Sequence, residues 1–114
     1  MPQQKSPAKP MPTPTLPDIT VRIRAAVAAG PRLNKTLRLD LTDLGSVFID
    51  GAAVSNADMP ADLTITISLD NLLAMAVGSL EPAFAIMVGK MRCSDLSLLI
   101  GLEDPLKELI AKIA

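Results

Sequence analysis

Histidine, tryptophan and tyrosine are absent from this chain of 114 residues, which also has only two phenylalanines and one cysteine. The absence of histidine excludes Ser-His-Asp and Cys-His nucleophiles and every zinc site that needs imidazole. The single cysteine, Cys93, rules out an intramolecular disulfide and a cysteine-based metal cluster within one chain. We therefore predict no catalytic residue, no metal site and no cofactor, and we expect a protein that is not an enzyme.

Neither sign of charge is in large excess, because 11 Lys and Arg residues nearly balance 12 Asp and Glu residues. Without basic clusters or aromatic faces for base stacking, no nucleic-acid partner is expected. The longest apolar stretch, residues 72–89, carries Ser79, Glu81 and Pro82 near its middle, where a membrane span tolerates them least. No transmembrane segment is predicted. The first residues also lack the apolar segment of a secretory signal, so we expect a cytoplasmic protein.

The N-terminal 17 residues differ in composition from the rest of the chain. They contain six of the ten prolines and few large apolar side chains. Such a segment cannot bury enough surface to offset the entropy lost on ordering. We predict a proline-rich disordered tail over residues 1–17 and one folded domain over residues 18–114.

The start of the domain fits two types of secondary structure. Apolar and polar residues alternate over residues 19–24, as in a strand, but apolar residues also recur every four positions, as in a helix. Asp18 can cap a helix, the alanine-rich run 25–29 favours one, and Gly30-Pro31 would end it. Context therefore favours a helix over residues 18–30.

Four later segments alternate between apolar and polar residues and are predicted to be strands. The first two are separated by a short turn and indicate a hairpin. Together they predict a sheet with one aliphatic face and one face of threonines and charges. The segments are residues 36–42, 46–50, 62–68 and 90–93.

Helices are predicted for residues 69–77 and 80–88, and again for residues 95–114, with a break at Asp104-Pro105. Helices with an apolar stripe must cover the apolar face of the sheet. The stripe of Leu106, Leu109, Ile110 and Ile113 fits either an ordinary packed helix or a lid that opens to a ligand or touches a membrane.

Several of these segments in order resemble the sterol carrier protein 2 (sterol-transfer) family, in its bacterial single-domain type. The resemblance lies in DLTITIS at 62–68, DNLLA at 70–74, GSLEP at 78–82, Ala85 and GKMR at 89–92. It implies an α/β (α+β) fold, in which helices cover one face of a mainly antiparallel sheet of four to five strands. It also implies a lipid-binding or lipid-transfer protein, whose apolar cavity holds a fatty acyl, acyl-CoA, phospholipid, sterol-like or isoprenoid ligand.

Burial of an acyl chain needs space rather than reactive groups, because each methylene removed from water contributes about 0.8 kcal/mol. With so few aromatics, aliphatic residues and flexible methionines must line any such cavity. The same residues would close the core if no cavity existed. The candidate ligand-binding residues are Phe48, Ile65, Leu72, Met75, Phe84, Met87, Met91, Leu99 and Leu106.

Other partners follow from the same pattern. Only residues 18–34 precede the first clear strand, so the cavity is expected to be open at one end. A symmetric homodimer that covers the opening is one prediction, and transient contact with a membrane is another. Lys90 and Arg92 lie on the polar side of the last strand, where a solvated face or contact with a phosphate or carboxylate head group both fit.

One alternative function uses the same fold. The domain would be a non-catalytic accessory subunit that presents an apolar intermediate to a partner enzyme in lipid or quinone metabolism. The proline-rich tail could then dock on that partner, although a disordered leader fits the same composition.

Overall fold

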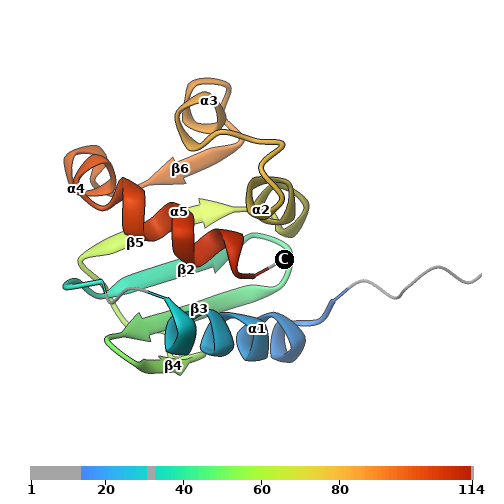
Figure 1. The fold of residues 1–114 in the computed structure, drawn as a ribbon, viewed down its shortest axis with the longest axis vertical. Coiled ribbons are helices and arrows are strands. Elements are labelled where there is room, and N and C mark those ends of the chain that lie inside the picture. The colour runs from blue at the N-terminus through green and yellow to red at the C-terminus, as the bar shows by residue number, and fades with distance from the viewer. Residues whose placement is uncertain (1–13, 31–32, 114) are drawn as a thin grey trace, which may run out of the picture.

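In the computed structural model of the chain, which describes residues 14–30 and 33–113, a layer of helices lies against one sheet (Figure 1). The helices are α1 (Leu16–Ala29), α2 (Leu69–Ala76), α3 (Pro82–Met87), α4 (Leu96–Gly101) and α5 (Glu103–Ala111). The strands are β2 (Leu37–Leu41), β3 (Gly45–Asp50), β4 (Ala53–Ser55), β5 (Leu63–Ile67) and β6 (Met91–Cys93).

The strand order is β4-β3-β2-β5-β6. Strand β2 pairs antiparallel with β3, as the predicted hairpin requires, and parallel with β5. The two outer pairs, β3 with β4 and β5 with β6, are antiparallel. The predicted fold class is confirmed, and the sheet is a mixed one of five strands. Strand β4 was not predicted, because three residues with one buried position, Val54, are too few to show an apolar–polar alternation in the sequence.

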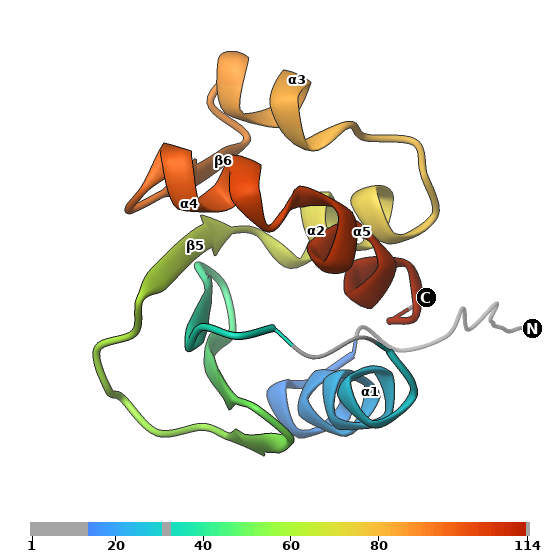
Figure 2. The same ribbon diagram turned by 60° about the vertical axis from the view of Figure 1, so that its left-hand side comes forward.

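Alternation along β2 and β5 separates the two faces of the sheet. Buried and half-buried residues alternate in both strands. The buried set of β2 lies beside that of β5, with Leu39 opposite Ile65 and Leu41 opposite Ile67. These side chains belong to the same core as the buried residues of α1, α2 and α5. Seen after a turn of 60°, the helices lie on one side of the sheet (Figure 2).

Residues 16–29 form a helix, so the strand alternative is wrong. Its N-cap is Thr15, not Asp18: the Thr15 side chain accepts a hydrogen bond from the Asp18 backbone N–H, and the Asp18 carboxylate accepts one from the Thr15 N–H. This reciprocal pair is a capping box. The helix ends at Ala29, with Gly30 as C-cap, and Pro31 lies outside the described residues.

The C-terminal region divides two residues earlier than predicted. Leu102 ends α4 and caps α5, whereas Pro105 lies within the first turn of α5. A proline is tolerated there, because the first N–H groups of a helix have no intrahelical acceptor. Leu106, Leu109, Ile110 and Ile113 are all buried, so in this structure their stripe packs as an ordinary helix.

Residues 1–13 of the predicted proline-rich tail lie outside the described residues. The last residues of the predicted tail belong to the domain, because Thr15 caps α1 and Leu16 and Pro17 are its first two residues.

Candidate functional site

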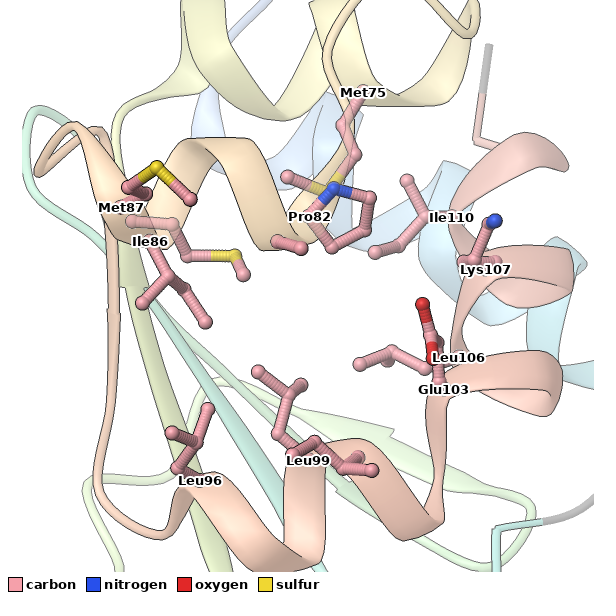
Figure 3. Close-up of a pocket in the computed structure, with 13 residues that line it drawn as sticks. Met75, Pro82, Ile86, Met87, Leu96, Leu99, Glu103, Leu106, Lys107 and Ile110 are labelled. Atoms are coloured by element: carbon pink, nitrogen blue, oxygen red, sulfur yellow. The ribbon is translucent and has the colours of Figure 1, made fainter.

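An apolar cavity of about 360 Å³ lies where α3 and α4 stand apart above the sheet. Figure 3 shows side chains from α2, α3, α4 and α5 around this common space. It is lined by Met75, Pro82, Ala83, Ile86, Met87, Met91, Leu96, Leu99, Ile100, Glu103, Leu106, Lys107 and Ile110.

Local sequence explains how α3 comes to border the cavity. Pro82 begins the helix, as its fixed φ and missing N–H favour. The helix ends before Gly89, whose φ of +80° turns the chain back into β6. Glycine adopts this left-handed conformation without steric cost. Met91 then pairs with Ile67 and is buried, so its side chain forms the floor of the cavity.

A bend at Leu102 positions the opposite wall. Leu99 lies before this bend on α4, and Leu106 and Ile110 follow it on α5. Asp95 fixes the start of α4, because its carboxylate accepts a hydrogen bond from the Leu98 N–H at 3.0 Å. Two short helices at an angle therefore present aliphatic side chains from two directions (Figure 3).

The mouth of the cavity is open to solvent. Met87 is 79% exposed, Ile100 63% and Leu96 53%, although all three line the space. A second recess of about 150 Å³ shares Met75, Pro82, Lys107 and Ile110 with the cavity. The apolar space therefore continues toward the α2–α3 connection.

Only two lining residues are charged, Glu103 and Lys107, and both are exposed. The Lys107 Nζ lies 3.9 Å from Glu81 Oε2, a solvated pair of small energetic value. Cys93 is half-buried and does not line the cavity. In residues 14–30 and 33–113 no group of three or more His, Cys, Asp or Glu side chains is arranged to hold a metal.

Two carboxyl groups of the described residues have clearly shifted pKa values, and neither lies in the cavity. Hydrogen bonds from the Thr15 backbone and side chain lower the pKa of Asp18. Thr36 lowers the pKa of Asp62 in the same way. The cavity therefore offers an apolar lining with two charged residues, Glu103 and Lys107.

A comparison with protein-family models identifies the family of this chain. Residues 17–104 match the model of the SCP-2 sterol transfer family. The chain belongs to this family. A comparison with curated proteins returned no match.

Solved structures of SCP-2 proteins share the fold. The crystal structure of sterol carrier protein 2 like 2 from Aedes aegypti is 27% identical, with a TM-score of 0.62 over 74% of this chain and 89% of that one. The solution structure of palmitated SCP2L2 from Aedes aegypti is 25% identical, with a TM-score of 0.58 over 84% and 94%. Aedes aegypti SCP-2 in complex with palmitate is 18% identical and has a TM-score of 0.63 over 84% and 94%.

Across the described part of the chain, the helices are too short or too polar for any of them to traverse a bilayer.

Five of the nine predicted ligand-binding residues line the cavity: Met75, Met87, Met91, Leu99 and Leu106. The other four do not. Ile65 and Leu72 lie in the closed core, 2% and 1% exposed. Phe84 points away from the core and is 52% exposed. Phe48 alternates with Val47 and Ile49, so it lies on the other face of the sheet, where it pairs with Arg38 and Ser55.

The sequence reasoning missed most of the wall that α3 and α4 contribute, including Ile86, Leu96 and Ile100. A signal for them exists in α4. Leu96 and Ile100 are four residues apart and flank Leu99, which widens the apolar face beyond the buried stripe. Apolar residues in excess of what packing needs mark the rim of this cavity.

Proposed function

We propose that this SCP-2 domain binds a lipid by enclosing its acyl chain in the cavity between α2, α3, α4 and α5. The observation that carries the proposal is the cavity itself: about 360 Å³ of space, lined by aliphatic and methionine side chains. Ligand pockets in proteins commonly have volumes of about 300–1,000 Å³, so the space suits one chain.

The relatives support the same ligand class. SCP2L2 from Aedes aegypti, 25% identical to this chain, is described in its palmitated form. A long saturated acyl chain is therefore the first candidate. The unbranched, flexible Met75, Met87 and Met91 can adapt their shape to such a chain.

Burial of the chain provides enough free energy for binding. Ten methylenes removed from water contribute about 8 kcal/mol at about 0.8 kcal/mol each. A dissociation constant of about 1 µM also corresponds to about 8 kcal/mol. Because association also costs several kcal/mol of lost motion, micromolar binding needs more than ten buried methylenes, as in a long acyl chain.

The head group of the ligand would stay at the mouth. Lys107 is the cationic residue of the lining and is half-exposed, and its contact with Glu81 is long. A carboxylate placed there remains hydrated and gains a favourable charge interaction. This orientation avoids burying a charge in an apolar space, which is costly.

The experiment fills the cavity without disturbing the core. Ala83 is exposed and lines the cavity, so Ala83→Trp adds a large side chain where space exists. The matched control is Ala28→Trp on α1, which is also exposed and does not line the cavity. We expect displacement of a fluorescent fatty acid by palmitate to weaken at least tenfold in Ala83→Trp and to stay unchanged in Ala28→Trp.

Native mass spectrometry of gently purified protein supplies the second readout. Stoichiometric lipid adducts are expected for the parent chain and for Ala28→Trp, and are expected to be lost in Ala83→Trp. No adduct on any variant, together with no displacement at micromolar concentration, would remove the lipid-binding function.

An accessory role in lipid or quinone metabolism uses the same cavity and adds a partner enzyme. The predicted tail of residues 1–17 supplies the proposed docking element through residues 1–13, because Thr15, Leu16 and Pro17 belong to the start of α1. A pull-down that compares the full chain with a chain starting at Pro14, which keeps the Thr15 cap, separates the roles. Partners lost on truncation support docking through the tail, and partners retained by both chains remove the tail from this alternative.

A further inference from the structure

A second hollow lies on the polar face of the sheet, behind the strand that floors the apolar cavity. It is a shallow groove of about 380 Å³ at the ends of β5 and β6. Its lining residues are Thr42, Thr66, Ile67, Ser68, Asn71, Gly89, Lys90 and Arg92. Two of these residues are cationic and none is acidic, so the lining carries a local charge of opposite sign to the net charge of the chain.

Alternation along the edge strand separates the two hollows. Met91 faces the apolar cavity, whereas Lys90 and Arg92, on either side of it, line the polar groove. Both cations are exposed, and within residues 14–30 and 33–113 neither forms a salt bridge. They are therefore available to a ligand.

Hydrogen bonds hold one wall of the groove in place. The Asn71 side-chain amide donates to the Lys90 carbonyl at 3.3 Å, which ties α2 to the start of β6. The Asn71 backbone N–H donates to the Ser68 hydroxyl at 3.2 Å. In the described part of the chain, the hydroxyls of Thr42 and Thr66 have no hydrogen-bond partner, so both are free to donate to an anion.

The nearest acidic residues do not neutralise the two cations. Asp40 pairs with Thr66 from the β2 side, and Arg92 pairs with Thr66 from the β6 side. Two strand spacings, about 10 Å, therefore separate the backbones at Asp40 and Arg92. Asp43 is occupied as an acceptor for the Leu69 N–H at 3.1 Å.

We propose that this groove binds a phosphate group. A phosphomonoester carries a charge of about −1.5 to −2 near neutral pH and has three acceptor oxygens. Arg92 can donate two parallel hydrogen bonds to it, Lys90 adds a point charge, and the hydroxyls of Thr42 and Thr66 serve the remaining oxygen. A phosphate therefore uses both cations of the lining and the two threonine hydroxyls.

The phosphate can belong to a small molecule in solution or to the head group of a lipid. Because β6 is an edge strand, a lipid could pass over the turn at Gly89 with its chain in the apolar cavity and its phosphate in the groove. The groove itself does not depend on lipid binding. Its chemistry is the same for both sources, and the experiment separates them.

The first experiment titrates inorganic phosphate into the full chain at low salt and follows backbone amide shifts by NMR. Shifts are expected at Thr42, Thr66, Gly89 and Arg92. Arg92→Gln is expected to weaken binding about tenfold or more, and Lys90→Gln severalfold, because charge-assisted hydrogen bonds are lost. The matched control, Arg22→Gln, removes an exposed cation of α1 that lies outside the groove and is expected to change nothing.

Two outcomes would overturn the proposal. One is the absence of shifts in the groove at millimolar phosphate, and the other is an equal weakening by Arg22→Gln, which would indicate a general effect of net charge. Thermal unfolding of each variant shows whether the fold is retained. Should Arg92→Gln unfold, Thr66→Val and Arg92→Lys supply the same test, because each keeps part of the lining.

The second experiment compares lysophosphatidic acid with a fatty acid of equal chain length. If the phosphate belongs to a lipid, Arg92→Gln weakens lysophosphatidic acid binding and leaves fatty acid binding unchanged. If it belongs to a small molecule, Arg92→Gln weakens only inorganic phosphate. Ala83→Trp keeps the two proposals apart, because it is expected to abolish fatty acid binding and to leave the shifts with inorganic phosphate intact.

Discussion

Leucines that border the apolar cavity differ from leucines in the closed core in what surrounds them. Leu72 is 1% exposed and lies in the core, whereas Leu106, 5% exposed, lines the cavity. Truncation costs the lost burial plus a term for the new space, and a side chain beside existing space makes fewer contacts. We expect Leu72→Ala to lower the free energy of unfolding by about 3–5 kcal/mol and Leu106→Ala by about 2–3 kcal/mol. Urea unfolding measures both, and equal losses would mean that the cavity is closed in solution.

Asp62 links acid stability to one hydrogen-bonded pair. Its carboxylate accepts hydrogen bonds from the Thr36 backbone and hydroxyl at 3.0 and 3.1 Å, which hold its pKa below the ordinary value of 3.8. A pKa lowered on folding stabilises the protein above the unfolded pKa, and this contribution is lost as pH falls through the folded pKa. Thr36→Val removes the hydroxyl that donates to this carboxylate and that accepts from the Asp62 backbone N–H at 2.8 Å, and it leaves the backbone donor of Thr36.

We therefore expect the pKa of Asp62 in Thr36→Val to rise part of the way toward its ordinary value. The variant should be less stable than the parent above about pH 5, and the difference should shrink below about pH 4. NMR titration of Asp62 and urea unfolding, both carried from about pH 6 down through the folded pKa, measure the two effects. The control Thr42→Val, at an exposed threonine away from Asp62, should leave the acid limb unchanged; an equal loss at all pH values in Thr36→Val would exclude the linkage.

Some residues of the site could be predicted from composition, whereas the place of others depends on strand register. Met75, Met91 and Leu99 were named because aliphatic and methionine side chains must line any space in a chain with so few aromatics. Phe48 was misplaced because Val47, Phe48 and Ile49 form an unbroken apolar run, so composition does not show which of them faces the helices. Only the strand register assigns Phe48 to the other face.

Helix α1 depends at its start on one threonine. The Thr15 hydroxyl caps the helix and also donates to the Asp18 carboxylate at 3.0 Å. Thr15→Ala should lower the free energy of unfolding by about 1 kcal/mol, and the pKa of Asp18 should rise. Thr15→Ser keeps the hydroxyl and should retain the stability of the parent chain. Urea unfolding and NMR titration measure these effects, and a Thr15→Ser variant as unstable as Thr15→Ala would show that the cap is not the cause.

Elements were predicted well where one periodicity dominated, and less well at their ends. The alternation of β2 and β5 placed both strands within one residue at each end. The break between α4 and α5 was assigned to Asp104-Pro105, because proline usually ends a helix. In the structure the chain bends at Leu102 and Pro105 falls in the first turn of α5, where a proline is tolerated.

At the scale of the whole molecule, one short edge strand separates two environments. Met91 contributes to the apolar cavity, and Lys90 and Arg92 to the polar groove behind it. The alternation of polar and apolar residues in β6 predicted from the sequence that Met91 and its two neighbours lie on opposite faces of the sheet. It did not show that the helices leave a space over one face, because this depends on the angle between α3 and α4.

The open mouth of the cavity leads to the last prediction, which concerns association of whole molecules. Three large apolar side chains of α3 and α4 line it and are exposed to solvent: Met87, Leu96 and Ile100. A two-fold dimer that places this rim against its own copy would cover it, because a two-fold interface uses the same surface on both subunits.

We expect sedimentation of the ligand-free protein to show concentration-dependent dimers. Met87→Asp with Ile100→Asp should abolish them, and the matched pair Val21→Asp with Val77→Asp, equally exposed but away from the cavity, should not. A monomer at all concentrations would contradict the prediction and leave the rim to the lipid that enters through it.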